Sequence, residues 1–89
     1  MIEYRLGYFA RSLCGHDKDR LYMIVKEDGE MVGLCDGVHR RLANPKMKKK
    51  KHIQMMRSEQ MAEAFPALVQ SSDADTQIRE AVKAAGKQE

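Results

Sequence analysis

The sequence is poor in residues that build large apolar or stacking surfaces: its 89 residues include no tryptophan, and aromatic side chains make up only 6%. A platform that stacks many nucleic-acid bases is therefore excluded. No apolar run approaches the ~20 residues that cross a bilayer, so we expect no transmembrane segment. A (β/α)₈ barrel needs roughly 250 residues and is also excluded. The length predicts one small domain with an appendage.

Enzyme motifs are also missing. The serine, histidine and acidic residues do not fall in a nucleophile motif, and the glycines do not form a phosphate-binding loop of the G-x-x-x-x-G-K type. The N-terminus, Met1 to Arg5, lacks the basic region and apolar core of a secretory signal. We therefore expect a non-enzymatic, cytoplasmic protein without a cofactor.

The two cysteines each lie near a histidine. Cys14 precedes His16 and Cys35 precedes His39, and these are ligand types that zinc prefers. The spacing of the first pair is unusual for a structural zinc site, and a disulfide between the cysteines is disfavoured in a reducing cytoplasm. The sequence favours two reduced, partly buried cysteines and no metal site.

Charge is distributed very unevenly along the chain, although the net charge is only +3. Residues 1–57 contain 13 Lys and Arg against 7 Asp and Glu, whereas residues 58–89 contain 3 against 6. The stretch 39–57 carries no acidic residue at all. Closely spaced like charges repel, and a polyphosphate partner relieves this repulsion. The alternative is a solvated, flexible basic loop without a specific partner.

Short apolar runs joined by tight turns dominate the first two thirds of the chain. Asp28-Gly29 and Asp36-Gly37 are strong hairpin signals. The runs predict a mainly β domain, either a small barrel or a strongly bent sheet, with strands at 6–13, 21–25, 31–35, 38–42 and 52–55. The expected core residues are Leu6, Phe9, Leu21, Met23, Val25, Val32, Leu34 and Leu42.

Helical patterns replace the strand patterns after Arg57. Ser58 can cap a helix at about 58–65, and Pro66 is expected to kink or end it. A second helix at about 74–85 carries an apolar stripe formed by Ile78, Ala81, Val82 and Ala85. Such a short helix should pack on the β domain or on a partner. The sequence thus divides into a β domain at 1–57, with a basic arm at 46–52, and a helical tail at 58–89.

Two groups of residues resemble a known family. The first comprises Leu6-Gly7, Ser12 and the stretch from Gly15 to Val25, which is similar to the strand, turn and apolar strand of the KOW motif. The second comprises Asp36-Gly37, Arg40, Pro45-Lys46, Lys48 and His52. Together they resemble bacterial KOW-domain RNA-binding proteins, relatives of the eukaryotic and archaeal large-subunit ribosomal proteins fourteen-e, six-e and twenty-seven-e. The resemblance covers roughly residues 5 to 55.

The resemblance implies an SH3-like (KOW) β-barrel that binds RNA, usually ribosomal RNA, through loops at one end and a basic extension. Where the family turn usually has glycine, this chain has Asp19. Aspartate tolerates positive φ better than most residues, so the fold should survive, although its carboxylate would face a phosphate. With the basic run included, the candidate RNA-binding residues are Lys18, Arg20, Arg40, Arg41, Lys46, Lys48, Lys49, Lys50, Lys51 and His52.

Some candidate residues have a structural alternative. On a strand, Arg40 and Arg41 point to opposite faces, so at most one of them should reach a given RNA surface. The arginine that faces inward would then pair with Asp17 or Asp36. Tyr8 is a candidate for base stacking, but a place in the core is the favoured interpretation.

The sequence therefore predicts an RNA-binding protein of the bacterial cytoplasm that associates with ribosomal RNA or the ribosome during translation, with ribosomal proteins as further partners. Lysine-rich contacts should follow RNA shape and charge with weak base readout, neutralising about four to six phosphates. The competing hypothesis is a protein-interaction module of the transcription or translation machinery, which uses the barrel and the amphipathic tail. Adhesion to a membrane is weaker, because no apolar anchor adjoins the lysine run.

Overall fold

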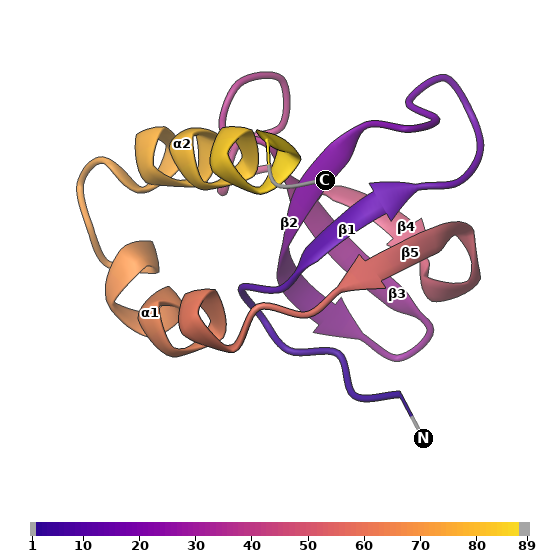
Figure 1. Cartoon of the computed structure of the whole chain (residues 1–89), viewed down its shortest axis with the longest axis horizontal. Coiled ribbons are helices and arrows are strands. Elements are labelled where there is room, and N and C mark those ends of the chain that lie inside the picture. Colours follow the sequence, from indigo (N-terminus) through magenta and orange to yellow (C-terminus); the bar gives the residue numbers. More distant parts are fainter. Residues whose placement is uncertain (1, 88–89) are drawn as a thin grey trace.

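A computed structural model describes residues 2–87 of the chain. It confirms a mainly β domain followed by C-terminal helices (Figure 1). The strands are β1 (Phe9–Ser12), β2 (Leu21–Asp28), β3 (Met31–Cys35), β4 (Lys46–Lys49) and β5 (Ile53–Met56). A short 3-10 helix, η1 (Lys50–His52), joins β4 to β5, and the helices are α1 (Glu59–Val69) and α2 (Ala74–Lys87).

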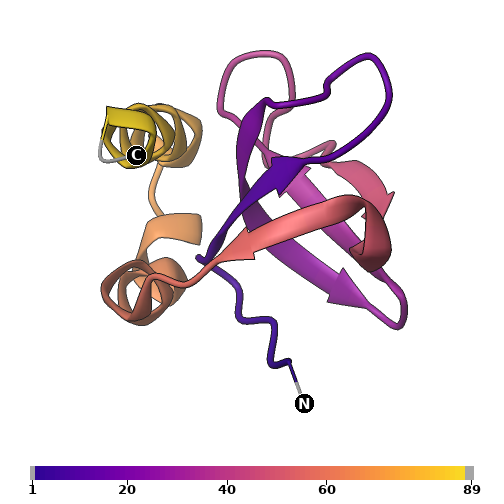
Figure 2. The same ribbon diagram turned by 45° about the vertical axis from the view of Figure 1, so that its right-hand side comes forward.

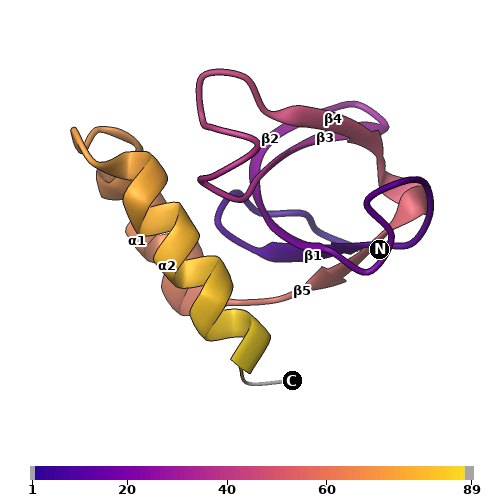
Figure 3. The same cartoon turned by 90° about the horizontal axis from the view of Figure 1, so that it is seen from above.

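The five strands form one antiparallel sheet with the order β4-β3-β2-β1-β5. Seen from above, the sheet curls strongly, so that β3 and β4 lie across from β1 and β5 (Figure 3). The predicted hairpin at Asp28-Gly29 is confirmed: β2 and β3 are joined by Gly29 and Glu30, with Gly29 at φ +60°. A register shift between Ile24 and Lys26 in β2 marks an irregularity that accompanies the bend.

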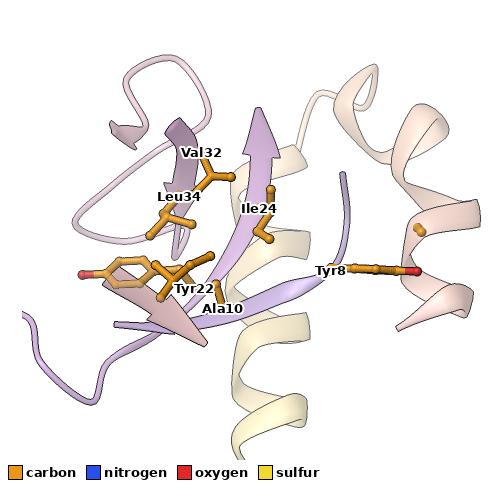
Figure 4. Close-up of a cluster of buried hydrophobic side chains, with 8 residues drawn as sticks. Tyr8, Ala10, Tyr22, Ile24, Val32 and Leu34 are labelled. Atoms are coloured by element: carbon orange, nitrogen blue, oxygen red, sulfur yellow. The ribbon is translucent and has the colours of Figure 1, made fainter. Parts of the chain in front are cut away.

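Two apolar layers hold the sheet, because side chains alternate between the faces of β1 and β2. The inner layer, on the concave side, consists of Tyr8, Ala10, Tyr22, Ile24, Val32, Leu34, Ile53 and Ala62 (Figure 4). The outer layer packs beneath the helices and consists of Phe9, Met23, Val25, Cys35, Phe65, Leu68, Ala74 and Ile78. A run with apolar residues on both faces, such as 21–25, is what burial on both sides requires.

The helix α2 packs on the outer face of the sheet (Figure 2), whereas α1 contributes Phe65 and Leu68 to the outer layer and Ala62 to the inner layer. Ser58 caps α1 as expected, since its hydroxyl accepts the N–H of Met61. The expected end of the first helix near residue 65 is wrong, because α1 continues through Pro66 to Val69. Phe65 and Leu68 are both buried, and burial of two such side chains, about 1.5–3 kcal/mol each, offsets the roughly 3 kcal/mol cost of an interior proline. Within residues 2–87, neither helix is long and apolar enough to cross a membrane.

The predicted strand at 38–42 is wrong, because residues 36–45 form a loop. The carboxylate of Asp36 accepts the backbone N–H groups of Val38 and Arg40, at 2.8 and 2.9 Å, and so takes the place of a strand partner. The fourth strand is formed by Lys46–Lys49 instead, and the segment predicted to be a basic arm is this strand followed by η1.

Most of the predicted core residues are confirmed. Phe9, Met23, Val25, Val32 and Leu34 are buried. Leu21 and Leu42 are only partly buried and pack against the outer layer. The prediction for Leu6 is wrong: it is 38% exposed and precedes β1, which begins only at Phe9.

Candidate functional site

The loop between β1 and β2 is anchored by a buried carboxylate, that of Asp17, which is only 5% exposed. Its partners are the hydroxyls of Ser12 (2.9 Å) and Tyr22 (3.2 Å) and the ammonium groups of Lys46 (2.9 Å) and Lys48 (2.7 Å). Burial alone would raise the pKa of Asp17, but the hydrogen bonds from Lys48, Lys46 and Ser12 outweigh it and hold this pKa well below its usual range. The carboxylate is therefore charged and joins the loop to β4.

Lys48 is the central cation of this cluster. Its ammonium group also donates to the Ser12 hydroxyl (2.7 Å) and the Cys14 carbonyl (2.8 Å), and its side chain is only 10% exposed. Lys46, with a side chain that is 30% exposed, retains some contact with solvent. Lys46 and Lys48, which the sequence predicts to bind RNA, are thus both paired with the buried carboxylate of Asp17.

Asp19 adopts a left-handed backbone conformation, with φ +73°. Its N–H donates to the carbonyl of Ser12 at 2.8 Å, and its own carbonyl accepts from the Arg11 guanidinium at 2.6 Å. The expectation that aspartate tolerates this conformation at the turn is confirmed. Lys18 and Arg20, on either side of Asp19, are exposed.

The loop between β3 and β4 is held at both ends by carboxylates. Asp36 begins it through the two backbone hydrogen bonds described above. Burial raises the pKa of Asp36, but the N–H groups of Arg40, Val38 and His39 outweigh this effect and lower it. Near the other end, the carboxylate of Asp75 in α2 accepts the N–H of Leu42 at 2.7 Å.

Gly37 makes this attachment to α2 possible. Its φ is +80°, and a Cβ atom added there would lie 2.2 Å from the carbonyl oxygen of Asp75 and 2.7 Å from the backbone nitrogen of Arg79. Only glycine permits both the backbone conformation and the close approach. The loop that carries Arg40 and Arg41 is therefore fixed against a helix.

The two loops project from the same end of the sheet (Figures 1 and 2). We call the side chains of Lys18, Arg20, Arg40 and Arg41 the loop-end cations. Arg40 is half-buried and the other three are exposed. Among residues 2–87, none of the four forms an ion pair, whereas the carboxylates of Asp17 and Asp36 are engaged within the protein.

The loop also corrects the geometry expected for Arg40 and Arg41. Because these residues are not on a strand, they are not forced onto opposite faces. The structural alternative, an ion pair of one arginine with Asp17 or Asp36, does not form within residues 2–87: Asp17 pairs with lysines of β4, and Asp36 binds backbone N–H groups.

The remaining basic residues, Lys49, Lys50 and Lys51, lie beside the β2–β3 hairpin, and we call them the hairpin lysines. They line a pocket of about 340 Å³ together with Gly29 and Glu30. Lys50 forms an ion pair with Glu27 and lies over the ring of Tyr4, with 4.7 Å from ammonium to ring centroid. The hairpin also carries Asp28, so its acidic residues offset much of the local positive charge. His52 is half-buried, and its carbonyl accepts the N–H of Leu13 at 2.9 Å.

Two other candidate residues, Tyr8 and Cys35, belong to the core. Tyr8 is 2% exposed, so its ring is unavailable for base stacking. Cys14 is exposed, whereas Cys35 is buried, and both are free thiols. Burial and the nearby carboxylates of Asp75 and Asp36 raise the pKa of Cys35 to about 12. Within residues 2–87, no three His, Cys, Asp or Glu side chains come together to hold a metal ion.

Comparison of the sequence with protein-family models and with curated proteins gave no match. The assignment of function therefore depends on the geometry and charge of the chain itself.

Proposed function

We propose that the protein binds RNA, and that the curled sheet is an SH3-like barrel of the KOW type whose loop-end cations contact the phosphates. The observation that carries the proposal is the arrangement of charge at this end. Four cations have no carboxylate partner among the described residues, while the carboxylates of Asp17 and Asp36 are bound by lysines of β4 and by backbone N–H groups of the β3–β4 loop. The resemblance of residues 5 to 55 to ribosomal KOW proteins makes ribosomal RNA the favoured class.

Electrostatics sets the expected mode of binding. Each phosphate that a cation neutralises releases condensed counterions, so affinity falls steeply with salt. For about four contacts, the logarithm of the association constant should fall with the logarithm of salt concentration with a slope of about −3. Three of the four cations are arginines, whose planar guanidinium groups can bind phosphate in a bidentate manner or stack on unpaired bases. The anchored loops present these groups in fixed positions, which favours folded RNA over a flexible strand.

The experiment compares two fourfold variants that remove the same charge. One replaces the loop-end cations Lys18, Arg20, Arg40 and Arg41 with alanine. The other replaces four cations outside both basic sets, namely Lys26, Arg79, Lys83 and Lys87. Binding to total ribosomal RNA is measured by filter retention at about 0.15 M salt.

We expect the first variant to lose about a hundredfold in affinity and the control to lose less than about threefold. Equal losses in both variants would mean that only net charge matters, and the proposed contact surface would be wrong. Circular dichroism checks that both variants are folded.

The hypothesis of a protein-interaction module with a groove-binding tail is less favoured. The apolar stripe of α2, formed by Ile78, Ala81, Val82 and Ala85, packs against the outer face of the sheet. The helix therefore presents no free apolar stripe to a partner's groove while it remains in this position.

A further inference from the structure

An apolar groove lies between α1 and α2, and Leu68 of the outer layer lines it. Its volume is about 860 Å³. Leu68 forms its most buried part, with Met61 and Ala81 half-buried beside it. Ala64 and Ala67 of α1 also line the groove and are exposed. Small side chains at these positions let the backbone of another molecule approach closely.

Carboxylates accompany the apolar lining. Asp73, just before α2, and Glu80, within it, line the groove directly. The helix α1 contains Glu59 and Glu63 and no basic residue. Glu59 is paired with Arg5 and Arg57, and Glu80 forms exposed ion pairs with Arg79 (3.3 Å) and Lys83 (3.9 Å). Within residues 2–87, Asp73 has no cationic partner, and no lysine or arginine lines the groove.

We propose that this groove binds a basic amphipathic helix of a partner protein. Apolar side chains at i, i+3 or i+4, and i+7 of such a helix would enter between α1 and α2, and its lysines or arginines would approach Asp73 and Glu80. The proposal is independent of RNA binding. From the sequence, the tail is expected to supply a helix that binds in a partner's groove, whereas here α1 and α2 form the groove and the partner supplies the helix.

The shape of the surface favours a helical ligand over an extended one. An extended peptide gains affinity by pairing its backbone with a strand edge. The groove is lined entirely by residues of the two helices and their connection, whose backbone groups are largely paired within the helices. A helix satisfies its own backbone and needs only an apolar surface.

A second copy of this chain fits the groove poorly. Its amphipathic helices are α1 and α2, and their apolar side chains, including Phe65 and Ile78, are buried against the sheet. Neither helix can offer these residues to another molecule without leaving its own core. The occupant is therefore a different protein with a free basic helix.

The test uses the full chain and a synthetic peptide of about 18 residues, long enough to form a helix on binding. Leucines occupy the i, i+3, i+4 and i+7 positions, and lysines with a few alanines occupy the rest. A scrambled peptide of the same composition has no apolar stripe. Titration of ¹⁵N-labelled protein by NMR gives both the affinity and the residues whose amide signals move.

We expect signals of the groove residues to shift, and the scrambled peptide to bind at least about tenfold more weakly. Two variants test the surface itself. Ala67→Gln adds bulk at an exposed helical position, and Glu80→Lys reverses a charge in the lining. Each should weaken binding about threefold to tenfold.

Glu63→Lys is the matched control, because it makes the same charge reversal on α1 at a residue outside the groove lining. Its effect should stay below about twofold. The proposal is overturned if the shifts map to the acidic β2–β3 hairpin, if Glu63→Lys and Glu80→Lys weaken binding equally, or if the peptide fails to bind. It is also overturned if the groove signals move with protein concentration alone, since a second copy would then be the occupant.

Discussion

Replacing Asp17 with asparagine removes the charge on which the β1–β2 loop depends while preserving the size of the side chain. Asparagine can still interact with the hydroxyls of Ser12 and Tyr22, but it leaves Lys46 and Lys48 without an anionic partner. Removing one partner of a buried ion pair costs about 3–5 kcal/mol. Because the side chain of Lys46 is 30% exposed and can turn toward water, we expect a loss near the lower limit, about 3 kcal/mol.

A loss of this size is large for such a small domain. At about 0.05–0.15 kcal/mol per residue, a chain of 89 residues is stable by only about 4–13 kcal/mol. The midpoint of thermal unfolding should fall by about 12–24 °C. Because the sequence has no tryptophan, unfolding in urea is followed by far-ultraviolet circular dichroism and tyrosine fluorescence. A loss below about 0.5 kcal/mol would refute the role given to this carboxylate.

Asp19→Asn is the matched control, since it changes the charge of the same loop by the same amount. Asp19 is exposed, and asparagine also tolerates its φ of +73°, so stability should change by less than about 0.5 kcal/mol. The two variants should also affect RNA binding with opposite signs. Removing the exposed carboxylate of Asp19 reduces repulsion of phosphate and tightens binding. Asp17→Asn should weaken binding at a temperature where it is still folded, although it too removes a negative charge. Tighter binding by both variants would show that loop anchoring contributes nothing to recognition.

Three further predictions concern the anchors and the hairpin lysines. The lowered pKa of Asp17 means that its contribution to stability is present above its unfolded pKa of about 3.9 and is lost as pH falls toward its folded value. The difference in free energy of unfolding between the wild type and Asp17→Asn should therefore narrow from about pH 5 to pH 2. A difference that does not change with pH contradicts this. Gly37→Ala should lower the free energy of unfolding by about 2–4 kcal/mol, because its Cβ would meet the Asp75 carbonyl at 2.2 Å. Gly29→Ala, at φ +60° with nothing within 4 Å, should lower it by only about 1 kcal/mol. Equal losses in urea unfolding would count against the attachment of the β3–β4 loop to α2. Replacing both Lys49 and Lys51 with alanine should change RNA affinity less than about fivefold in filter retention, and a loss as large as that of the loop-end variant would place the interface at the hairpin.

The strands that the sequence predicts correctly are those with apolar residues at alternating positions or on both faces. Residues 21–25 and 31–35 are of this kind, and they lie at the centre of the sheet. The segment at 38–42 has the alternation of a strand but only Val38 and Leu42 as apolar members. There, a side-chain carboxylate binds the backbone N–H groups and a loop forms instead. The sequence does not predict the fourth strand, because lysines occupy the positions where a strand pattern would have apolar residues. Lys46 and Lys48 pair with the buried Asp17, and no local sequence pattern indicates this contact.

The candidate site was only partly predictable for a similar reason. Cations are visible in the sequence, but the acids that neutralise them are distant along the chain. Lys50 pairs with Glu27, which precedes it by more than twenty residues, and Lys48 pairs with Asp17. An acid-free stretch of sequence is therefore not an acid-free surface. Asp75, which fixes the β3–β4 loop through the N–H of Leu42, lies in a helix that sequence patterns assign to the tail. Its role depends on tertiary contact alone.

Ultraviolet crosslinking in cells, followed by sequencing of the RNA attached to the protein, tests the central claim most directly. The account predicts reads concentrated at one site in ribosomal RNA, and a loss of this enrichment when Lys18, Arg20, Arg40 and Arg41 are replaced with alanine. Recovery of no RNA above a non-crosslinked control, or the same enrichment from the fourfold variant, would contradict it.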